Sequence, residues 1–229
     1  LFDGKGEVKI WNLLRRPDQE PFKAVLWCEL EGNGSVGTHY QKERVVLPIL
    51  VLKTLRERGL DASLCIAGRL AWNDAVSEIE TLVKTSQMET LVRLVGPYSN
   101  ASASMLYASS NILLHLKYKD PCPNVVIESL ASGLPVVGSS SGGLPELVGD
   151  NGGVLLDVVD DWNNMHYPSV EKVADAVESI YAKLDIYAAA SRKRALEKFN
   201  SVNWRSTHER WFSSLVDMNP LSSSIDAGK

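Results

Sequence analysis

The chain of 229 residues has few cysteines, no long apolar run and no excess of basic charge. Its three cysteines are scattered and form no Cys-x-x-Cys pair, so we expect free thiols in a reducing compartment. No stretch approaches the ~20 apolar residues that cross a bilayer. The net charge of −4 argues against a nucleic-acid partner, because proteins that bind nucleic acids usually have a basic surface. We therefore expect a globular protein that is cytoplasmic, or peripheral at a membrane surface.

What is present is an alternation of apolar runs and helical patterns. Runs typical of buried strands occupy residues 23–28, 61–68, 91–95, 111–116, 135–138 and 154–156. Apolar residues with helical spacing occupy 42–57, 74–85, 101–108, 170–181, 187–198 and 206–216. The alternation predicts an α/β fold, with a doubly wound, mostly parallel Rossmann-like sheet of about six strands and helices on both faces. Ligand sites in such sheets lie at the carboxyl ends of the strands.

Composition also predicts the domain boundaries. Residues 1–22 have no clear period, and we interpret them as a linker or as the remnant of a missing N-terminal domain. Residues 23–218 are predicted to form one domain, and the Ser-rich residues 219–229 a disordered tail. Because the chain begins with Leu1 and not with Met, we expect it to be a piece of a longer protein.

The most informative segment runs from Asp120 to Glu128, DPCPNVVIE, directly after a predicted strand. Its two carboxylates stand eight positions apart around a predicted helix start, where Asn124 is a suitable N-cap residue. Pro121 and Pro123 stiffen the approach to this helix. The unpaired N–H groups of a helix start bind anions. The segment therefore predicts a site for a ligand with a central diphosphate and hydroxyl groups on either side.

Two glycine signals follow the same helix. Gly133 is placed to end it in the left-handed conformation, and Pro135 then opens a short buried strand. The sequence SGGLPE at 141–146 indicates a second glycine turn after that strand. Each strand in this region is thus followed by a loop at the expected ligand-binding edge.

These motifs resemble the donor-site signature of family 4 retaining glycosyltransferases, which have the GT-B fold. The resemblance covers residues 23–216, is strongest at 111–147, and is to the C-terminal half of a two-domain enzyme. The family pattern is Glu, seven residues, Glu; here Asp120 keeps the first charge on a shorter side chain. The resemblance implies transfer of a hexose, with retention, from a UDP- or GDP-linked sugar to an acceptor glycan, lipid or small molecule. No cofactor and no metal are implied.

The resemblance also implies a role for each site residue. Asp120 is the catalytic candidate and orients the donor hexose without acting as a nucleophile, while Glu128 binds the ribose hydroxyls. Lys42 reaches the donor phosphate, although no arginine between Arg16 and Arg44 accompanies it as it often does in the family. The nucleobase is expected near Gly96 and Tyr98. The diphosphate is expected near four residues of the loop, Cys122, Pro123, Asn124 and Val125.

Two other functions remain open at this point. Gly32 to Gly37 matches the G-x-G-x-x-G pattern of a nicotinamide-dependent oxidoreductase, but the second strand ends in Ala67-Gly68-Arg69 without an acidic residue for the ribose. The chain could also be a non-catalytic nucleotide-binding or interaction module that needs a partner. The helix at 206–216 packs either on another domain, as in the resembling family, or on its own sheet.

Overall fold

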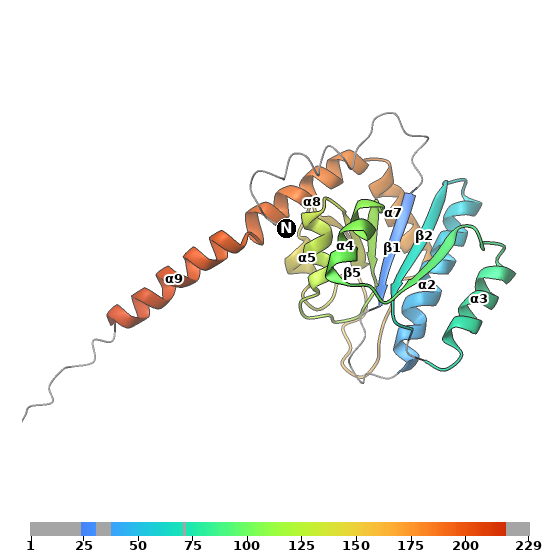
Figure 1. Ribbon diagram of the computed structural model, residues 1–229, viewed down its shortest axis with the longest axis horizontal. Coiled ribbons are helices and arrows are strands. Elements are labelled where there is room, and N and C mark those ends of the chain that lie inside the picture. The colour runs from blue at the N-terminus through green and yellow to red at the C-terminus, as the bar shows by residue number, and fades with distance from the viewer. Residues whose placement is uncertain (1–23, 31–37, 71, 219–229) are drawn as a thin grey trace, which may run out of the picture.

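A computed structural model describes residues 24–30, 38–70 and 72–218 (Figure 1). The predicted linker at 1–22, the glycine pattern at 32–37 and the predicted tail at 219–229 lie outside the described residues.

A single parallel sheet organises the described chain, with the strand order β3-β2-β1-β4-β5-β6. The order reverses direction between β1 and β4, and such a reversal opens a ligand crevice at the carboxyl ends of the strands. The finding confirms the predicted parallel, doubly wound α/β architecture. The strands are β1 (Ala24–Leu30), β2 (Ala62–Gly68), β3 (Val92–Gly96), β4 (Ile112–His115), β5 (Val136–Ser139) and β6 (Gly153–Leu156).

Helices cover both faces of the sheet (Figure 1). Alternate residues of β2 enter two separate cores, because successive side chains of a strand point to opposite faces. Leu64 and Ile66 join the core under α2, α3 and α7, whereas Cys65 and Ala67 join the core under α4, α5 and α8. The helices are α2 (Thr38–Glu57), α3 (Ala75–Thr85), α4 (Asn100–Ala108), α5 (Asn124–Ala131), α6 (Leu144–Val148), α7 (Val170–Tyr181), α8 (Leu184–Lys198) and α9 (Ser201–Met218).

The start of α5 differs from the prediction, and its end agrees. Pro123 occupies the N-cap position without a side-chain hydrogen bond, and Asn124 is the first helical residue, so the predicted Asn124 cap is wrong. The physical reason is that proline fixes its own φ near the value needed at a helix entry and leaves Asn124 inside the first turn. At the other end Gly133 has φ of 75°, which confirms the left-handed stop.

The glycine segment after β5 is more than the predicted turn. Gly142 has φ of 59°, and the chain then enters the short helix α6 at Leu144. Pro145 lies in the first turn of α6, where its missing N–H removes no helical hydrogen bond. This helix is not predictable from the sequence, because five residues carry too little periodicity to be recognised.

The terminal helix α9 extends away from the sheet and its helices (Figure 1). Its large apolar side chains are exposed, with Trp204 and Trp211 at 63% and Phe212 at 58%. Packing of this helix on its own sheet is therefore wrong, and packing on another domain stays a prediction. Among the residues that the structure describes, no helix has the length and apolar character needed to cross a membrane.

Candidate functional site

Three charged or titratable side chains meet where β4 ends. Asp120 is 3% exposed, and its Oδ2 atom lies 3.0 Å from Nζ of Lys117 and 3.2 Å from Nε2 of His115. His115 is the last residue of β4 and is equally buried, whereas Lys117 is partly exposed. The catalytic candidate therefore belongs to a cluster at the carboxyl edge of the sheet, next to the strand at which the order reverses.

Burial and hydrogen bonding act in opposite directions on Asp120. Burial acts to raise the pKa of its carboxyl group, since it disfavours the charged form. The contacts with His115 and then Lys117 favour the carboxylate and outweigh burial, so the pKa lies below its ordinary value. The group is thus an anion at neutral pH although water hardly reaches it.

The glycine turn after β5 is hydrogen-bonded to the loop after β4 that carries Asp120. The N–H of Gly143 donates to the carbonyl oxygen of Asp120 at 2.8 Å, and the N–H of Lys119 donates to Oγ of Ser141 at 3.0 Å. A Cβ atom on Gly142 or Gly143 would overlap the backbone of residues 119–121. The two loops therefore approach as closely as they do only because both positions lack a side chain.

The predicted diphosphate loop leads directly into α5. Cys122 and Asn124 are exposed, whereas Pro123 and Val125 are buried and anchor the helix start. The first N–H groups of an α-helix have no partner within the helix, and they carry a partial positive charge. The geometry can therefore accept an anion beside Asp120, and the binding role of these four residues stays a prediction.

Glu128 is exposed on α5 and has a partner from the neighbouring helix. The hydroxyl of Tyr107 on α4 donates to Oε2 of Glu128 at 2.6 Å. Tyr107 is itself 5% exposed, so its ring is fixed by packing and holds the carboxylate in one orientation. The sequence analysis did not single out Tyr107, because no local motif marks a contact across 21 positions.

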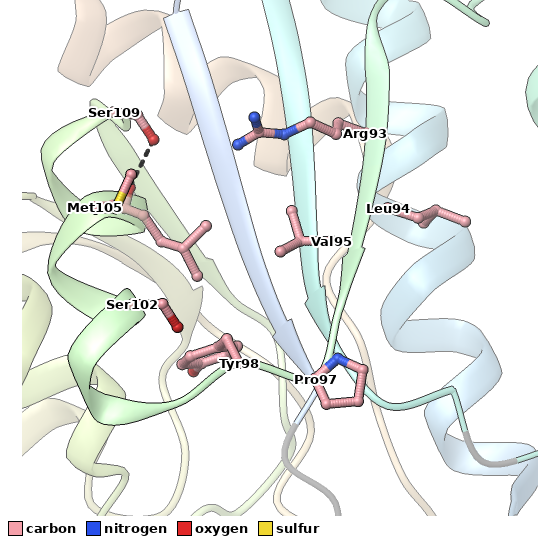
Figure 2. A pocket seen from close by; sticks show the side chains of 9 residues that line it. Arg93, Leu94, Val95, Pro97, Tyr98, Ser102, Met105 and Ser109 are labelled. Atoms are coloured by element: carbon pink, nitrogen blue, oxygen red, sulfur yellow. Dashed lines mark hydrogen bonds between the residues drawn. The ribbon is translucent and has the colours of Figure 1, made fainter.

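Gly96 is the last residue of β3, and Tyr98 lies in the short loop between β3 and α4. Gly96 has φ of 72°, which only glycine adopts without cost, and it turns the chain out of the strand. Tyr98 lines a cavity of about 520 Å³ between β3 and α4, which also includes Arg93, Val95 and Met105. Figure 2 shows the Tyr98 ring beside Ser102 at one end of this cavity. Tyr98 thus lines a hollow whereas Gly96 does not, and nucleobase binding at these residues stays a prediction.

Lys42 lies in α2 and is paired with α3. Its Nζ atom is 2.7 Å from Oε2 of Glu78, which also accepts a hydrogen bond from Nε1 of Trp72 at 3.1 Å. The hydrogen bond from Lys42 and then that from Trp72 lower the pKa of Glu78. Both charged side chains are 42% exposed, so a ligand phosphate can compete with Glu78 for the ammonium group.

Of the predicted site residues, the structure thus gathers Asp120, the start of α5 and Glu128 along one edge. His115 and Lys117 are the members that sequence reasoning missed. Lys117 lies three positions before Asp120, so the sequence indicated a possible ion pair. Whether the two side chains meet depends on how the loop after β4 folds. Within the described ranges, no group of three or more His, Cys, Asp or Glu side chains is placed to hold a metal ion.

Residues 34–167 match the family model described as glycosyl transferases group 1. The chain belongs to this family. Two similar curated proteins are D-inositol 3-phosphate glycosyltransferase of Corynebacterium kroppenstedtii, 32% identical over 38% of this chain, and N-acetyl-alpha-D-glucosaminyl L-malate synthase of Bacillus anthracis, 28% identical over 56%. The aligned parts are 20% and 32% of those proteins, so the chain spans a third or less of their length.

Solved glycosyltransferase structures share the fold. HepE of Anabaena in complex with UDP superposes with a TM-score of 0.64 at 17% identity, over 84% of this chain and 49% of that one. The C-terminal domain of the group 1 protein LpcC of Francisella tularensis gives 0.59 at 16% identity, over 84% and 92%. The chain therefore has the fold of the C-terminal domain of a GT-B glycosyltransferase, and its family is a transferase family rather than an oxidoreductase family.

Proposed function

We propose that this chain is the donor-binding half of a retaining glycosyltransferase that transfers a hexose from a nucleoside diphosphate sugar to an acceptor. The observation that carries the proposal is the buried, ionised Asp120 beside the start of α5. A charge that is 3% exposed is costly unless it is paired, and His115 and Lys117 supply the pairing. Such a group has a fixed position from which to orient a sugar hydroxyl.

The proposed donor lies along the carboxyl edge of the sheet. Its base is at Gly96 and Tyr98, its ribose at Glu128, its diphosphate at the start of α5, and its hexose at Asp120. The base subsite follows β3, whereas the ribose, diphosphate and hexose subsites all follow β4, so the proposed ligand extends from the β3 side of the sheet toward β4. The exposed Glu128 carboxylate, held by Tyr107, accepts hydrogen bonds from the two ribose hydroxyls.

Charge on the leaving diphosphate is the main electrostatic demand of the reaction. As the glycosidic bond breaks, negative charge grows on the phosphate oxygens, and preorganised donors lower the barrier. The start of α5 and the ammonium group of Lys42 supply these donors. Asp120 contacts the hexose hydroxyls and is not the nucleophile.

A UDP-linked donor is the first to test, because the similar HepE structures are described as complexes with UDP and with UDP-glucose. Calorimetric titration of the chain with UDP, GDP, ADP and NAD measures the affinity for each. We expect a nucleoside diphosphate to bind more tightly than NAD. Binding of NAD alone, or of none of the four, would contradict the proposal.

Glu128→Gln tests the ribose assignment in the same titration. The change removes a charge-assisted hydrogen bond worth about 1.5–3 kcal/mol, so the affinity for the nucleotide should fall by about tenfold or more. Glu80→Gln, on the exposed side of α3, is the matched control and should leave the affinity unchanged. An unaltered affinity in Glu128→Gln would place the ribose elsewhere.

A further inference from the structure

The segment between β6 and α7 presents a large aromatic side chain to solvent. Trp162 is 87% exposed, and its neighbours Asp160, Asn163 and Asn164 are exposed as well. An isolated exposed tryptophan is costly, since its ring is among the largest apolar surfaces that a side chain offers. The segment thus presents an apolar ring and polar side chains close together in the chain.

This segment is held in one conformation by Tyr118 and Asp161. The hydroxyl of Tyr118 donates to the carbonyl oxygen of Val159 at 2.7 Å and accepts from the N–H of Asp161 at 2.8 Å. The Asp161 carboxylate accepts from the N–H of Asn163 and from Nδ2 of Asn164, both at 2.8 Å. These hydrogen bonds, the Asn163 N–H first, hold the pKa of Asp161 well below its ordinary value. Trp162 therefore stands on an ordered turn, and little ordering entropy opposes binding to it.

Lys119 connects the ring to the loop that carries Asp120. Its Nζ atom lies 3.6 Å from the centroid of the Trp162 ring and 2.5 Å from Oδ1 of Asp160. The backbone of Lys119 has φ of 50°, a strained conformation for a residue with a side chain. Strain of this kind is retained where the surrounding contacts fix a functional geometry. The position of Trp162 is thus coupled to the residue directly before Asp120.

The place of Trp162 in the sheet order indicates which part of a ligand it meets. In the proposed function the base lies after β3 and the hexose lies after β4, beside the glycine turn that follows β5. Trp162 follows β6, the strand beyond β5. It therefore lies at the hexose end of the donor, far along the edge from the nucleobase.

We infer that Trp162 is a stacking platform for a pyranose ring of the acceptor, which makes the acceptor a carbohydrate. The C–H face of a pyranose is apolar and can bury against the face of the indole ring that Lys119 does not cover. The exposed Asn163 and Asn164, next in the chain, offer hydrogen-bonding groups for its hydroxyls. The inference rests on the proposed function only for the identity of this sugar as the acceptor. The stacking itself depends on the geometry of the 157–166 segment.

The experiment labels the chain with 5-fluorotryptophan and follows its fluorine NMR spectrum. The Trp162 signal is the one lost in Trp162→Phe. The probes are methyl glucopyranoside, methyl galactopyranoside and methyl mannopyranoside, each titrated in the presence of UDP. We expect at least one glycoside to shift the Trp162 signal in a saturable way. Trp162→Ala should weaken binding of that glycoside, followed by saturation-transfer NMR, about fivefold or more.

Two controls separate this inference from the proposed function. Trp204→Ala removes another exposed tryptophan, on α9, and should leave glycoside binding unchanged. Calorimetry of UDP with Trp162→Ala should give the affinity of the unaltered chain, because the platform does not contact the nucleotide. Glycoside binding that survives Trp162→Ala, or the absence of any glycoside binding to the unaltered chain, overturns the platform. Failure of UDP to bind the unaltered chain contradicts the proposed function instead.

Discussion

Asp120 is a buried carboxylate that the fold stabilises by contacts with two neighbouring side chains. The carboxylate is buried, and the imidazole of His115 and the ammonium group of Lys117 lie against it. The short aspartate side chain reaches both His115 and Lys117. Its depressed pKa means that the carboxylate stabilises the fold above its ordinary pKa of about 3.9. That contribution is lost as the pH falls from there through the folded-state pKa.

Asp120→Asn should lower the free energy of unfolding at pH 7 by about 1.5–3 kcal/mol, because it removes the anion that His115 and Lys117 contact. The difference from the unaltered chain should shrink as the pH falls from about 4 through the lowered folded-state pKa, where the wild-type carboxylate takes up a proton. Urea denaturation at a series of pH values measures this. Asp150→Asn, at an exposed turn, is the control and should change little. A difference that stays constant from pH 7 to pH 3 would contradict the assigned charge state.

The proposed contact of Lys42 with the donor phosphate can be tested from both sides of its ion pair, because Glu78 can be changed as well as Lys42. Lys42→Ala should weaken binding of UDP more than binding of uridine, since the ammonium group is assigned to the phosphates. Glu78→Gln leaves the lysine in place and removes its competitor, so UDP should bind about two- to fivefold more tightly. The exposed pair itself contributes little to stability, because solvent screens it. Equal losses for UDP and uridine in Lys42→Ala would limit the lysine to a structural role.

At the level of elements, the close approach of two loops sets the site. Gly143 packs against the backbone of Pro121, and its N–H holds the Asp120 carbonyl. Gly143→Ala forces these loops apart, and overpacking of this kind costs about 1–3 kcal/mol. We expect lower thermal stability and weaker UDP binding together, measured by calorimetry.

Gly59→Ala separates loop displacement from a general loss of stability. Gly59 has φ of 87° with no atom near its missing side chain, and it lies at the opposite end of α2 from Lys42. Alanine there strains the backbone only. The variant should therefore melt at a lower temperature and bind UDP normally. Loss of UDP binding in both variants would mean that stability alone accounts for the effect of Gly143→Ala.

The elements differ in how far the sequence could predict them. The long helices with apolar spacing, and the end of α5 at Gly133, were predictable because local periodicity and backbone conformation determine them. The helix α6 and the Pro123 cap were not, since both depend on how the chain leaves a neighbouring loop. Asp120 and Glu128 followed from a motif, whereas Tyr107 and Trp162 acquire their surroundings only through contacts between segments far apart in the chain.

At the scale of the whole molecule, the described residues form one α/β unit built on a single sheet. The chain covers about half the length of several solved glycosyltransferases, and it covers nearly all of a C-terminal domain that was solved by itself. The exposed apolar side chains of α9 have no covering partner among the described residues. Of the described residues, only those of this one α/β unit would contact a donor bound at Asp120.

We predict that this chain binds the donor nucleotide but transfers no sugar to an acceptor. Positioning of two reactants contributes up to about 7–11 kcal/mol to a reaction barrier, and one side of a cleft cannot position both. Incubation of the chain with UDP-glucose and the best-binding methyl glycoside, followed by NMR, measures transfer and hydrolysis separately. We expect slow hydrolysis of the donor at most. Efficient formation of a disaccharide would mean that the 229 residues build both sides of the site. It would also exclude the alternative of a non-catalytic module.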